Sequence, residues 1–225
     1  MFLNFSESFY PMSIKNAGIL GDVHAEDRVL IKVVSFFRDA GVDAIYCTGD
    51  LCDGYGSSEN VIRFVQKSKI QCVRGNHDLW CITGEMRDLT GAVECSALSL
   101  TSLQYLRQIP YIVLIDTVAG PVLLCHGILN NIMGRVADED CEGILESNLS
   151  FQEFLQGNYP EMLINGHSHR RMVKQVAQKT IINAGTLFRD HSPCASIVDF
   201  ENRVVTFYPI IDGIVADRRA ERVDF

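Results

Sequence analysis

The sequence lacks three features that would assign it to common functional classes: a basic surface, a long apolar run and closely paired cysteines. Its 20 lysines and arginines are outnumbered by 28 aspartates and glutamates, which gives a net charge of −8. Long nucleic acids are bound through basic surfaces, so this balance argues against them as partners. No run approaches the ~18 apolar residues of a membrane span, and residues 1–10 carry no basic residue ahead of their apolar positions, as a secretory signal would. We therefore expect a soluble cytoplasmic protein without a membrane partner.

The eight cysteines contain no Cys-x-x-Cys pair of the kind that binds zinc or forms redox disulfides. Several stand inside apolar runs, as at residues 45–47 and 123–125. This is the usage of buried thiols in a reducing compartment. We interpret the cysteines as core residues, although Cys52 stands in an acidic loop and could line a site.

The first third of the chain alternates strand-like and helix-like patterns. Apolar runs at residues 17–20, 43–47 and 70–73 are typical of strands, and residues 29–37 and 61–65 between them repeat apolar positions at helical spacing. Strands that alternate with helices predict a parallel sheet covered by helices.

The remainder of the chain is richer in strands, and residues 79–90 show no clear pattern. Strand patterns occupy residues 111–116, 122–125, 162–164, 172–177, 180–183, 195–200 and 204–208. We find no repeat and no linker between domains. We therefore expect an irregular leader over residues 1–16 and a single α/β domain over residues 17–225, with two sheets packed face to face between helices.

Polar residues mark the expected starts of three helices. Ser57 or Ser58 could cap the first of them. Thr101 and Ser150 each stand three residues before a glutamine or glutamate, which is the spacing of a capping box. We expect helices to begin at both.

Five short polar clusters each follow an apolar run, and together they contain five of the six histidines, with only His191 outside. The clusters are Asp22-Val23-His24, Gly49-Asp50-Leu51-Cys52-Asp53-Gly54, Gly75-Asn76-His77-Asp78, His126-Gly127 and Gly166-His167-Ser168-His169. Open α/β sheets gather their ligands at the carboxyl ends of strands, so we expect these clusters to meet. Carboxylate oxygens and imidazole nitrogens bind Mn²⁺, Fe²⁺ and Zn²⁺, and an aspartate can bridge two ions. The sequence therefore predicts one metal site collected from five loops.

Two pairs of these residues require bent loops. Asp22 and His24 are two positions apart, so in an extended chain their side chains face opposite sides. His167 and His169 have the same spacing. We expect the preceding Gly21 and Gly166 to allow the bends.

Each cluster taken alone also has a purely structural interpretation. Asp22 could cap a helix, His24 could be a surface residue and Asn76 could belong to a polar turn. His126 could be a core histidine at a strand end. We prefer the metal site because the whole set follows strands, whereas for Asp78 we prefer a turn residue.

In their order along the chain, the motifs GDVH, GDLCD, GNHD, HG and GHSH resemble those of the calcineurin-like metallophosphoesterase family. The resemblance spans Gly21 to His169 and extends loosely to residues 183–186. It implies a four-layer αββα sandwich of two mixed sheets flanked by helices, and hydrolysis of phosphate esters with two divalent metal ions. Manganese is the ion we expect first, with iron, zinc, nickel or magnesium as alternatives.

The resemblance also assigns roles to nine residues. One ion would be held by Asp22, His24 and His169, the other by Asn76, His126 and His167, and Asp50 would bridge them. A water or hydroxide shared by the ions would attack phosphorus in line. His77 would stand near the leaving group, where it can donate a proton or stabilise charge. Asp53 would orient His77, as the corresponding acid does in related protein phosphatases.

The chain departs from this family at positions that bear on the substrate. Gly54 stands where protein serine/threonine phosphatases carry an arginine for the phosphate, which argues against a phosphoprotein substrate. Ala25 replaces a glycine of many relatives. Residues 127–159 match no known substrate pocket, and we expect substrate identity to be decided there. Arg74 and Arg170 could face phosphate or solvent.

These observations favour a phosphodiesterase or a phosphatase of small molecules or nucleotides, and they leave open the ester type and the oligomeric state. The alternatives are a protein serine/threonine phosphatase, a metal-dependent nuclease, which the acidic balance disfavours, and a protein-binding scaffold. The scaffold would resemble a retromer subunit that has this fold and lacks a working metal site. The presence of all seven ligands together with His77 favours metal binding over the scaffold.

Overall fold

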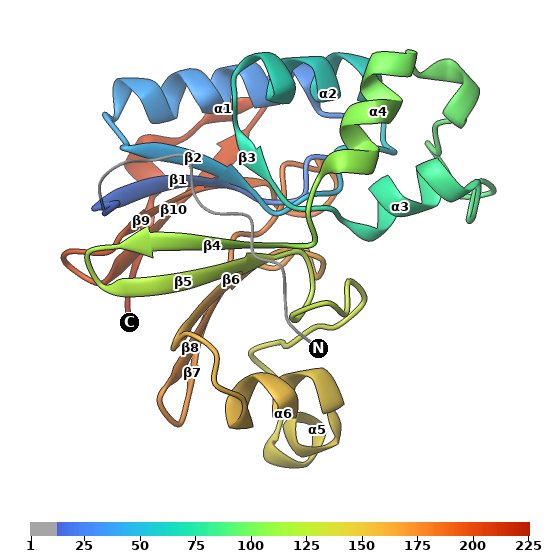
Figure 1. The fold of residues 1–225 in the computed structure, drawn as a ribbon. Helices are drawn as coiled ribbons and strands as arrows, with labels where there is room; N and C mark the ends of the chain where they lie inside the picture. The colour runs from blue at the N-terminus through green and yellow to red at the C-terminus, as the bar shows by residue number, and fades with distance from the viewer. Residues whose placement is uncertain (1–12) are drawn as a thin grey trace.

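The computed structural model describes residues 13–225, which form two mixed sheets packed face to face with helices on both outer faces (Figure 1). Helices α1 (Asp27–Asp39), α2 (Ser58–Lys67) and α4 (Leu100–Gln108) cover the first sheet, and α5 (Glu142–Ser147) and α6 (Leu149–Gln156) cover the second. Helix α3 (Asn76–Thr83) follows the strand at one edge of the first sheet. This arrangement confirms the predicted fold class.

The first sheet has seven strands in the order β11-β10-β9-β1-β2-β3, with β12 paired to β10. Its β1, β2 and β3 run parallel, whereas β9 runs antiparallel to β1. The strands are β1 (Asn16–Leu20), β2 (Ala44–Cys47), β3 (Gln71–Cys72), β9 (Cys194–Asp199), β10 (Val204–Ile211), β11 (Ile214–Val215) and β12 (Glu221–Asp224).

The second sheet has five strands in the order β4-β5-β6-β8-β7. Its β5, β6 and β8 are parallel, and β4 and β7 complete antiparallel pairs at the two edges. The strands are β4 (Ile112–Thr117), β5 (Gly120–Cys125), β6 (Met162–Asn165), β7 (Met172–Val176) and β8 (Lys179–Asn183). Two single-turn helices, η1 (Cys95–Ala97) and η2 (Asp217–Arg219), lie in connections.

Three apolar cores separate the four layers. Ile19 of β1 lies in the core between the sheets, whereas its neighbour Leu20 lies in the core beneath α1 and α2, because successive side chains of a strand point to opposite faces. Phe151 and Phe154 of α6 pack on the outer face of the second sheet. The strands are therefore apolar on both faces, which explains why they read as continuous apolar runs.

The helix starts were predicted correctly at one of three positions. Ser57 caps α2 and accepts a hydrogen bond from the Asn60 backbone N–H at 3.2 Å. The other two predictions, Thr101 and Ser150, are wrong by two residues, because the actual caps are Ser99 and Asn148. Each of these accepts the N–H three residues ahead, so a suitable cap earlier in the chain starts the helix before the predicted box.

The expected leader over residues 1–16 lies for the most part outside the described residues. Of its last four residues, Ile14 forms a parallel bridge to Thr117, the last residue of β4, and Asn16 begins β1. Between residues 13 and 225, no helix has both the length and the apolar character needed to cross a bilayer.

Candidate metal centre

All seven predicted metal ligands meet where the carboxyl ends of five strands come together. Asp22 and His24 follow β1, and Asp50 follows β2. Asn76 begins α3 just after β3, so this cluster lies on the first turn of a helix. From the second sheet, His126 follows β5, and His167 and His169 follow β6. The site therefore spans the junction of both sheets.

Four of the seven side chains form a compact donor group. Ligand atoms of Asp22, His24, Asp50 and His169 all lie within 4.8 Å of one another. His169 Nε2 is 2.9 Å from His24 Nε2 and 3.2 Å from Asp22 Oδ2. Except for His169, these residues are buried, so their polar atoms face one another and not bulk water.

The other three ligands form a second donor group beside the first. Asn76 Oδ1 lies 2.9 Å from both His126 Nε2 and His167 Nδ1. Asp50 connects the groups, because its Oδ2 is 3.6 Å from His24 Nε2 and 3.4 Å from His126 Nε2. Its carboxylate thus has the position that a ligand shared by two cations requires.

The hydrogen bonds at the Nδ1 atoms of His24 and His126 suit cation binding by these imidazoles. His24 Nδ1 lies 3.0 Å from the Asp53 carbonyl oxygen, and His126 Nδ1 lies 2.8 Å from that of Thr48. A carbonyl oxygen only accepts, so each Nδ1 carries a proton, and Nε2 is the nitrogen of each ring that can bind a cation. Carboxylates and Nε2 atoms that converge in this way fit a divalent cation.

The bends that bring paired ligands together occur at the ligands themselves. His24, His167 and His169 have φ values of 45°, 65° and 60°, in the left-handed region. The prediction that Gly21 and Gly166 make these bends is wrong, because neither has a positive φ. Both glycines are needed for close approach instead: a Cβ on Gly166 would overlap Asp22 Oδ1, and one on Gly21 would overlap the Gly185 carbonyl. Strained backbone of this kind is typical of functional sites.

The carboxylate of Asp22 is fixed by neutral as well as ionisable donors. Its Oδ1 accepts from Thr48 Oγ1 at 3.0 Å, and its Oδ2 accepts from the His167 backbone N–H at 2.8 Å. Burial by itself would raise the pKa of Asp22, but His126 and His169 hold it below the usual range. Asp22 is therefore ionised and ready to bind a cation.

His77 and Asp53 form a pair at the edge of this site. His77 Nδ1 is 2.8 Å from Asp53 Oδ2, and the His77 ring packs edge-on against His24 with ring centres 4.7 Å apart. Burial would lower the pKa of His77, but the hydrogen bond with Asp53 and the charge of Asp50 raise it overall. Among residues 13–225, no group hydrogen-bonds to His77 Nε2. This nitrogen can therefore donate a proton to a bound molecule.

Arg87 is a residue of the site that sequence reasoning missed. Its Nη1 and Nη2 each lie 2.9 Å from an oxygen of Asp53, and Nη1 also donates to the Val93 carbonyl at 2.8 Å. Burial would raise the pKa of Asp53, but the hydrogen bonds from His77, Arg87 and Val93 lower it to about 2. The sequence gives no signal for this contact, because Arg87 lies within the stretch 79–90 that has no periodicity.

Asp78 is a structural anchor, and its interpretation as a simple turn residue is wrong. It is fully buried in the first turn of α3. Its Oδ1 accepts from the backbone N–H groups of Leu51 and Cys52 at 2.8 and 3.2 Å, and its Oδ2 accepts from that of Gly75 at 3.0 Å. Asp78 thereby joins the loop that carries Asp50 to the helix that carries His77.

His191, the one histidine outside the motifs, also reaches the site. Its Nδ1 is 2.5 Å from His169 Nδ1, on the side of that ring away from Asp22. Cys52, in contrast, is fully buried in the core. Arg74 donates to the carbonyls of Leu106 and Arg107, so it is a structural residue.

The position of Gly54 explains why no arginine stands there. Its φ is 154°, and a Cβ would overlap the His24 carbonyl oxygen. The loop after Asp50 lies directly on the backbone of a ligand residue, which leaves no room for a side chain. The packing of this loop therefore excludes the arginine that protein serine/threonine phosphatases carry at this position.

The chain is similar to known proteins in sequence and in fold. A family model described as the calcineurin-like phosphoesterase superfamily domain matches residues 16–203. An uncharacterized protein of Methanocaldococcus jannaschii is 22% identical over 182 residues, which are 76% of this chain and 70% of that protein.

Solved structures show the same fold. A metallophosphoesterase from Sphaerobacter thermophilus superposes with a TM-score of 0.64 at 23% identity, covering 88% of this chain and 89% of that one. Vacuolar protein sorting 29 from Cryptosporidium parvum gives a TM-score of 0.55 at 16% identity, covering 95% and 99%. These likenesses concern the fold alone.

Proposed function

The chain belongs to the calcineurin-like phosphoesterase superfamily, and we propose that it hydrolyses small phosphate esters with two divalent cations. The observation that carries this proposal is the position of the Asp50 carboxylate, which contacts His24 of one donor group and His126 of the other. One cation would be held by Asp22, His24, Asp50 and His169, and the other by Asp50, Asn76, His126 and His167. Mixed carboxylate, amide and imidazole donors suit Mn²⁺ first, and also Fe²⁺, Zn²⁺, Ni²⁺ or Mg²⁺.

When bound, such ions supply Lewis-acid activation of the attacking water and of the phosphoryl group. The protein orients the donors through backbone contacts: His77 N–H donates to Asp50 Oδ1 at 2.9 Å, and His167 N–H donates to Asp22. His77 Nε2 faces outward from its bond with Asp53 and donates a proton to the leaving group. Asp53 and Arg87 keep that imidazole in place.

The shape of the loop after Asp50 bears on the substrate class. Gly54 offers no side chain at the position where protein phosphatases carry a phosphate-binding arginine. We therefore infer a small molecule or nucleotide, as a monoester or a diester. A protein-binding scaffold is the alternative, supported by the fold likeness to vacuolar protein sorting 29; the full donor set favours the enzyme.

The test compares p-nitrophenyl phosphate with bis-p-nitrophenyl phosphate, using metal-stripped protein refilled with Mn²⁺, Ni²⁺, Zn²⁺ or Mg²⁺. We expect metal-dependent turnover that falls at least a hundredfold in Asp50→Asn, while Asp116→Asn, an exposed aspartate on β4, keeps it. A folded, metal-loaded protein that hydrolyses neither ester would favour the scaffold.

The role of His77 has its own test. If His77 protonates the leaving group, His77→Ala should lose on the order of a hundredfold in kcat on alkyl phosphates and much less on p-nitrophenyl phosphate, whose leaving group needs no proton. An equal loss on both esters would assign His77 to positioning instead.

A further inference from the structure

A cavity of about 840 Å³ adjoins the metal centre on the side of His169. This volume lies in the usual range of small-molecule sites, about 300–1,000 Å³. We call it the arginine pocket and define it by Arg135, Ser168, Arg170, Arg171 and His191 of its lining. Because His169 is both a predicted metal ligand and part of the pocket wall, a molecule whose ester lies at the metal centre can extend into the pocket.

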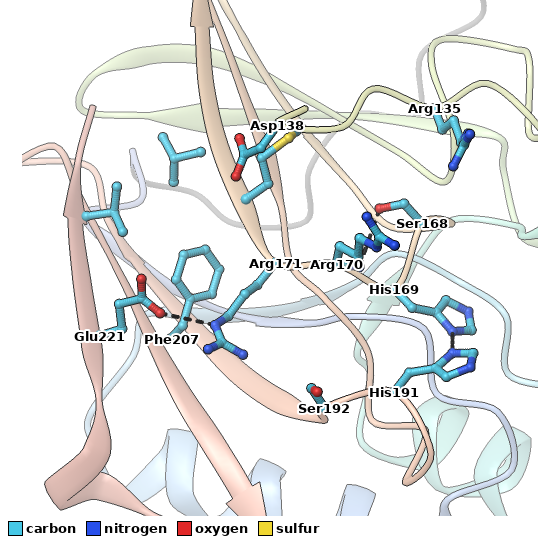
Figure 2. Close-up of a pocket in the computed structure, with 13 residues that line it drawn as sticks. Arg135, Asp138, Ser168, His169, Arg170, Arg171, His191, Ser192, Phe207 and Glu221 are labelled. Carbon is cyan, nitrogen blue, oxygen red and sulfur yellow. Dashed lines mark hydrogen bonds and ion pairs between the residues drawn. The ribbon is translucent and has the colours of Figure 1, made fainter. Parts of the chain in front are cut away.

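Charge is unevenly distributed around the arginine pocket. Figure 2 shows Arg135, Arg170 and Ser168 on the side of His169, and the carboxylates of Asp138 and Glu221 on the opposite side. Arg171 is paired with Glu221, Nε to Oε2 at 3.2 Å. The part of the pocket next to the metal centre therefore presents guanidinium groups.

Arg135 is held in place through its backbone and keeps its side chain available. Its guanidinium makes no hydrogen bond or ion pair with any residue from 13 to 225. Its carbonyl accepts from Asn148 Nδ2 at 2.8 Å, and Val136 after it is 1% exposed. The next turn of this loop is fixed by Lys174, whose Nζ donates to the Ala137 and Asp138 carbonyls at 2.8 and 2.9 Å.

Arg170 is paired with Glu139, but that pair is open to solvent. The two side chains are 69% and 63% exposed. Exposed ion pairs contribute little to stability, on the order of 0–1 kcal/mol, so a phosphate with two negative charges can displace Glu139. Arginine can bind two phosphate oxygens at once, whereas Arg170 contacts Glu139 through a single nitrogen and a single oxygen.

A second cavity, of about 800 Å³, lies near Tyr55 and is less suitable. Its Arg189 is already paired with both oxygens of Glu26 at 2.7 Å. None of the predicted metal ligands lines it. Arg28 in this second cavity also has a guanidinium without a hydrogen bond or ion pair among the described residues, so the shared metal ligand is what distinguishes the arginine pocket.

We propose that the arginine pocket binds a second phosphate group of the substrate, one that lies beyond the ester that is hydrolysed. The substrate class is then an organic molecule, such as a nucleotide, that carries at least two phosphates. This inference rests on the proposed function for its placement of the first phosphate. Arg135 supplies the specificity, with Arg170 as the second donor.

The experiment compares two matched pairs of compounds that differ by one phosphate. These are thymidine 5′-phosphate with thymidine 3′,5′-bisphosphate, and fructose 6-phosphate with fructose 1,6-bisphosphate, which present the second phosphate at different distances. Affinity is measured by calorimetry on the metal-stripped protein, where no turnover occurs, and kcat/KM is measured on the Mn²⁺-loaded protein. The variants are Arg135→Gln and Arg135→Gln with Arg170→Gln, and Arg63→Gln, an exposed arginine on α2, is the control.

We expect the second phosphate to tighten binding about tenfold or more in at least one pair, as hydrogen bonds between charged groups do. Arg135→Gln should remove most of this gain, and Arg63→Gln none of it. We expect Arg135→Gln to keep the native structure, because the exposed side chain makes no hydrogen bond or ion pair within the described chain; circular dichroism checks this. Equal affinity within both pairs, or a gain that survives in the double variant, would overturn the proposal.

The same measurements separate this proposal from the function on which it rests. Preferential binding of the bisphosphates without hydrolysis of any ester would leave the pocket assignment standing and reject the proposed hydrolase. Hydrolysis of simple esters with no preference for a second phosphate would support the proposed hydrolase and reject the pocket assignment.

Discussion

Arg87 binds both carboxylate oxygens of Asp53, with Nη1–Oδ1 and Nη2–Oδ2 distances of 2.9 Å each. Asp53 in turn binds His77 through Oδ2. The side chains of Asp53 and Arg87 are 3% and 10% exposed, so water does little to screen this contact. Arg87 therefore determines where the imidazole of His77 lies, although among the described residues it makes no hydrogen bond to a predicted metal ligand.

Removing the Arg87 guanidinium should destabilise the protein and impair catalysis. Arg87→Met leaves the Asp53 carboxylate buried without its cation, for which a loss of about 3 kcal/mol in the free energy of unfolding is typical. We expect kcat to fall with little change in KM, because the affected imidazole acts on the leaving group. Urea denaturation and steady-state kinetics test this, with the exposed Arg107→Met as the control. Unchanged stability in Arg87→Met would contradict the assigned role.

Acid should weaken the fold through Asp53. Its pKa is lowered from 3.8 to about 2 in the folded protein, since the bonds from His77 and Arg87 outweigh burial. The folded state therefore gains stability that is fully present above pH 3.8 and is lost as the pH falls toward 2. The contribution is about 2 kcal/mol. The free energy of unfolding, measured with urea between pH 5.5 and 3, should fall more steeply for the wild type than for Asp53→Asn. The same pH dependence in both proteins would contradict this contribution of Asp53.

Gly166 should be essential for metal binding. In Gly166→Ala the new Cβ would overlap Asp22 Oδ1 and come within 2.5 Å of Thr48 Oγ1, so the Asp22 carboxylate must move. We expect a loss of bound metal, measured by mass spectrometry of the refilled protein. Gly143→Ala in α5 is the matched control, because nothing lies within 4 Å of its Cβ position. That variant should keep its metal and gain up to about 1 kcal/mol of helix stability. Full metal content in Gly166→Ala would refute the placement of Asp22.

His191 should orient His169 and so affect the affinity for metal. The 2.5 Å contact joins the two Nδ1 atoms, so a proton on His169 Nδ1 leaves its Nε2 free for the cation. Loss of such a partner typically lowers metal affinity about 10- to 100-fold. We expect His191→Ala to show this in a metal titration, and His191→Gln to recover part of it, because the amide oxygen can accept the same proton. Wild-type affinity in both variants would show that the contact is incidental.

Much of the site could be predicted because its information is local. Each predicted ligand lies within a few residues of the end of a strand, and parallel strands bring their carboxyl ends to one edge of a sheet. The roles proposed for the seven residues and for His77 come from the resemblance of these short motifs, in their order, to a known family. Two sheets between helices could be expected from the alternation of strand and helix patterns, and the structure shows such strands to be apolar on both faces, as at Ile19 and Leu20.

The contacts that could not be predicted join residues with no common pattern. Arg87 reaches Asp53 across 34 positions, and His191 reaches His169 across 22. Asp78 has the composition of a turn, and only the fold shows that three backbone N–H groups point at its carboxylate. Such contacts depend on where loops return in space, and loop sequences carry no periodicity that records this.

The sequence by itself determined which donor atoms this protein offers, since strand periodicity and residue chemistry are properties of short segments. Only the tertiary structure decided how these atoms are oriented and what surrounds them. It placed the bends at His24, His167 and His169, with Gly166 beside Asp22, and it left Arg135 beside the metal centre with a free side chain. The physical reason is that orientation and surroundings are set by close packing between distant segments, where a single Cβ or guanidinium group decides what can fit.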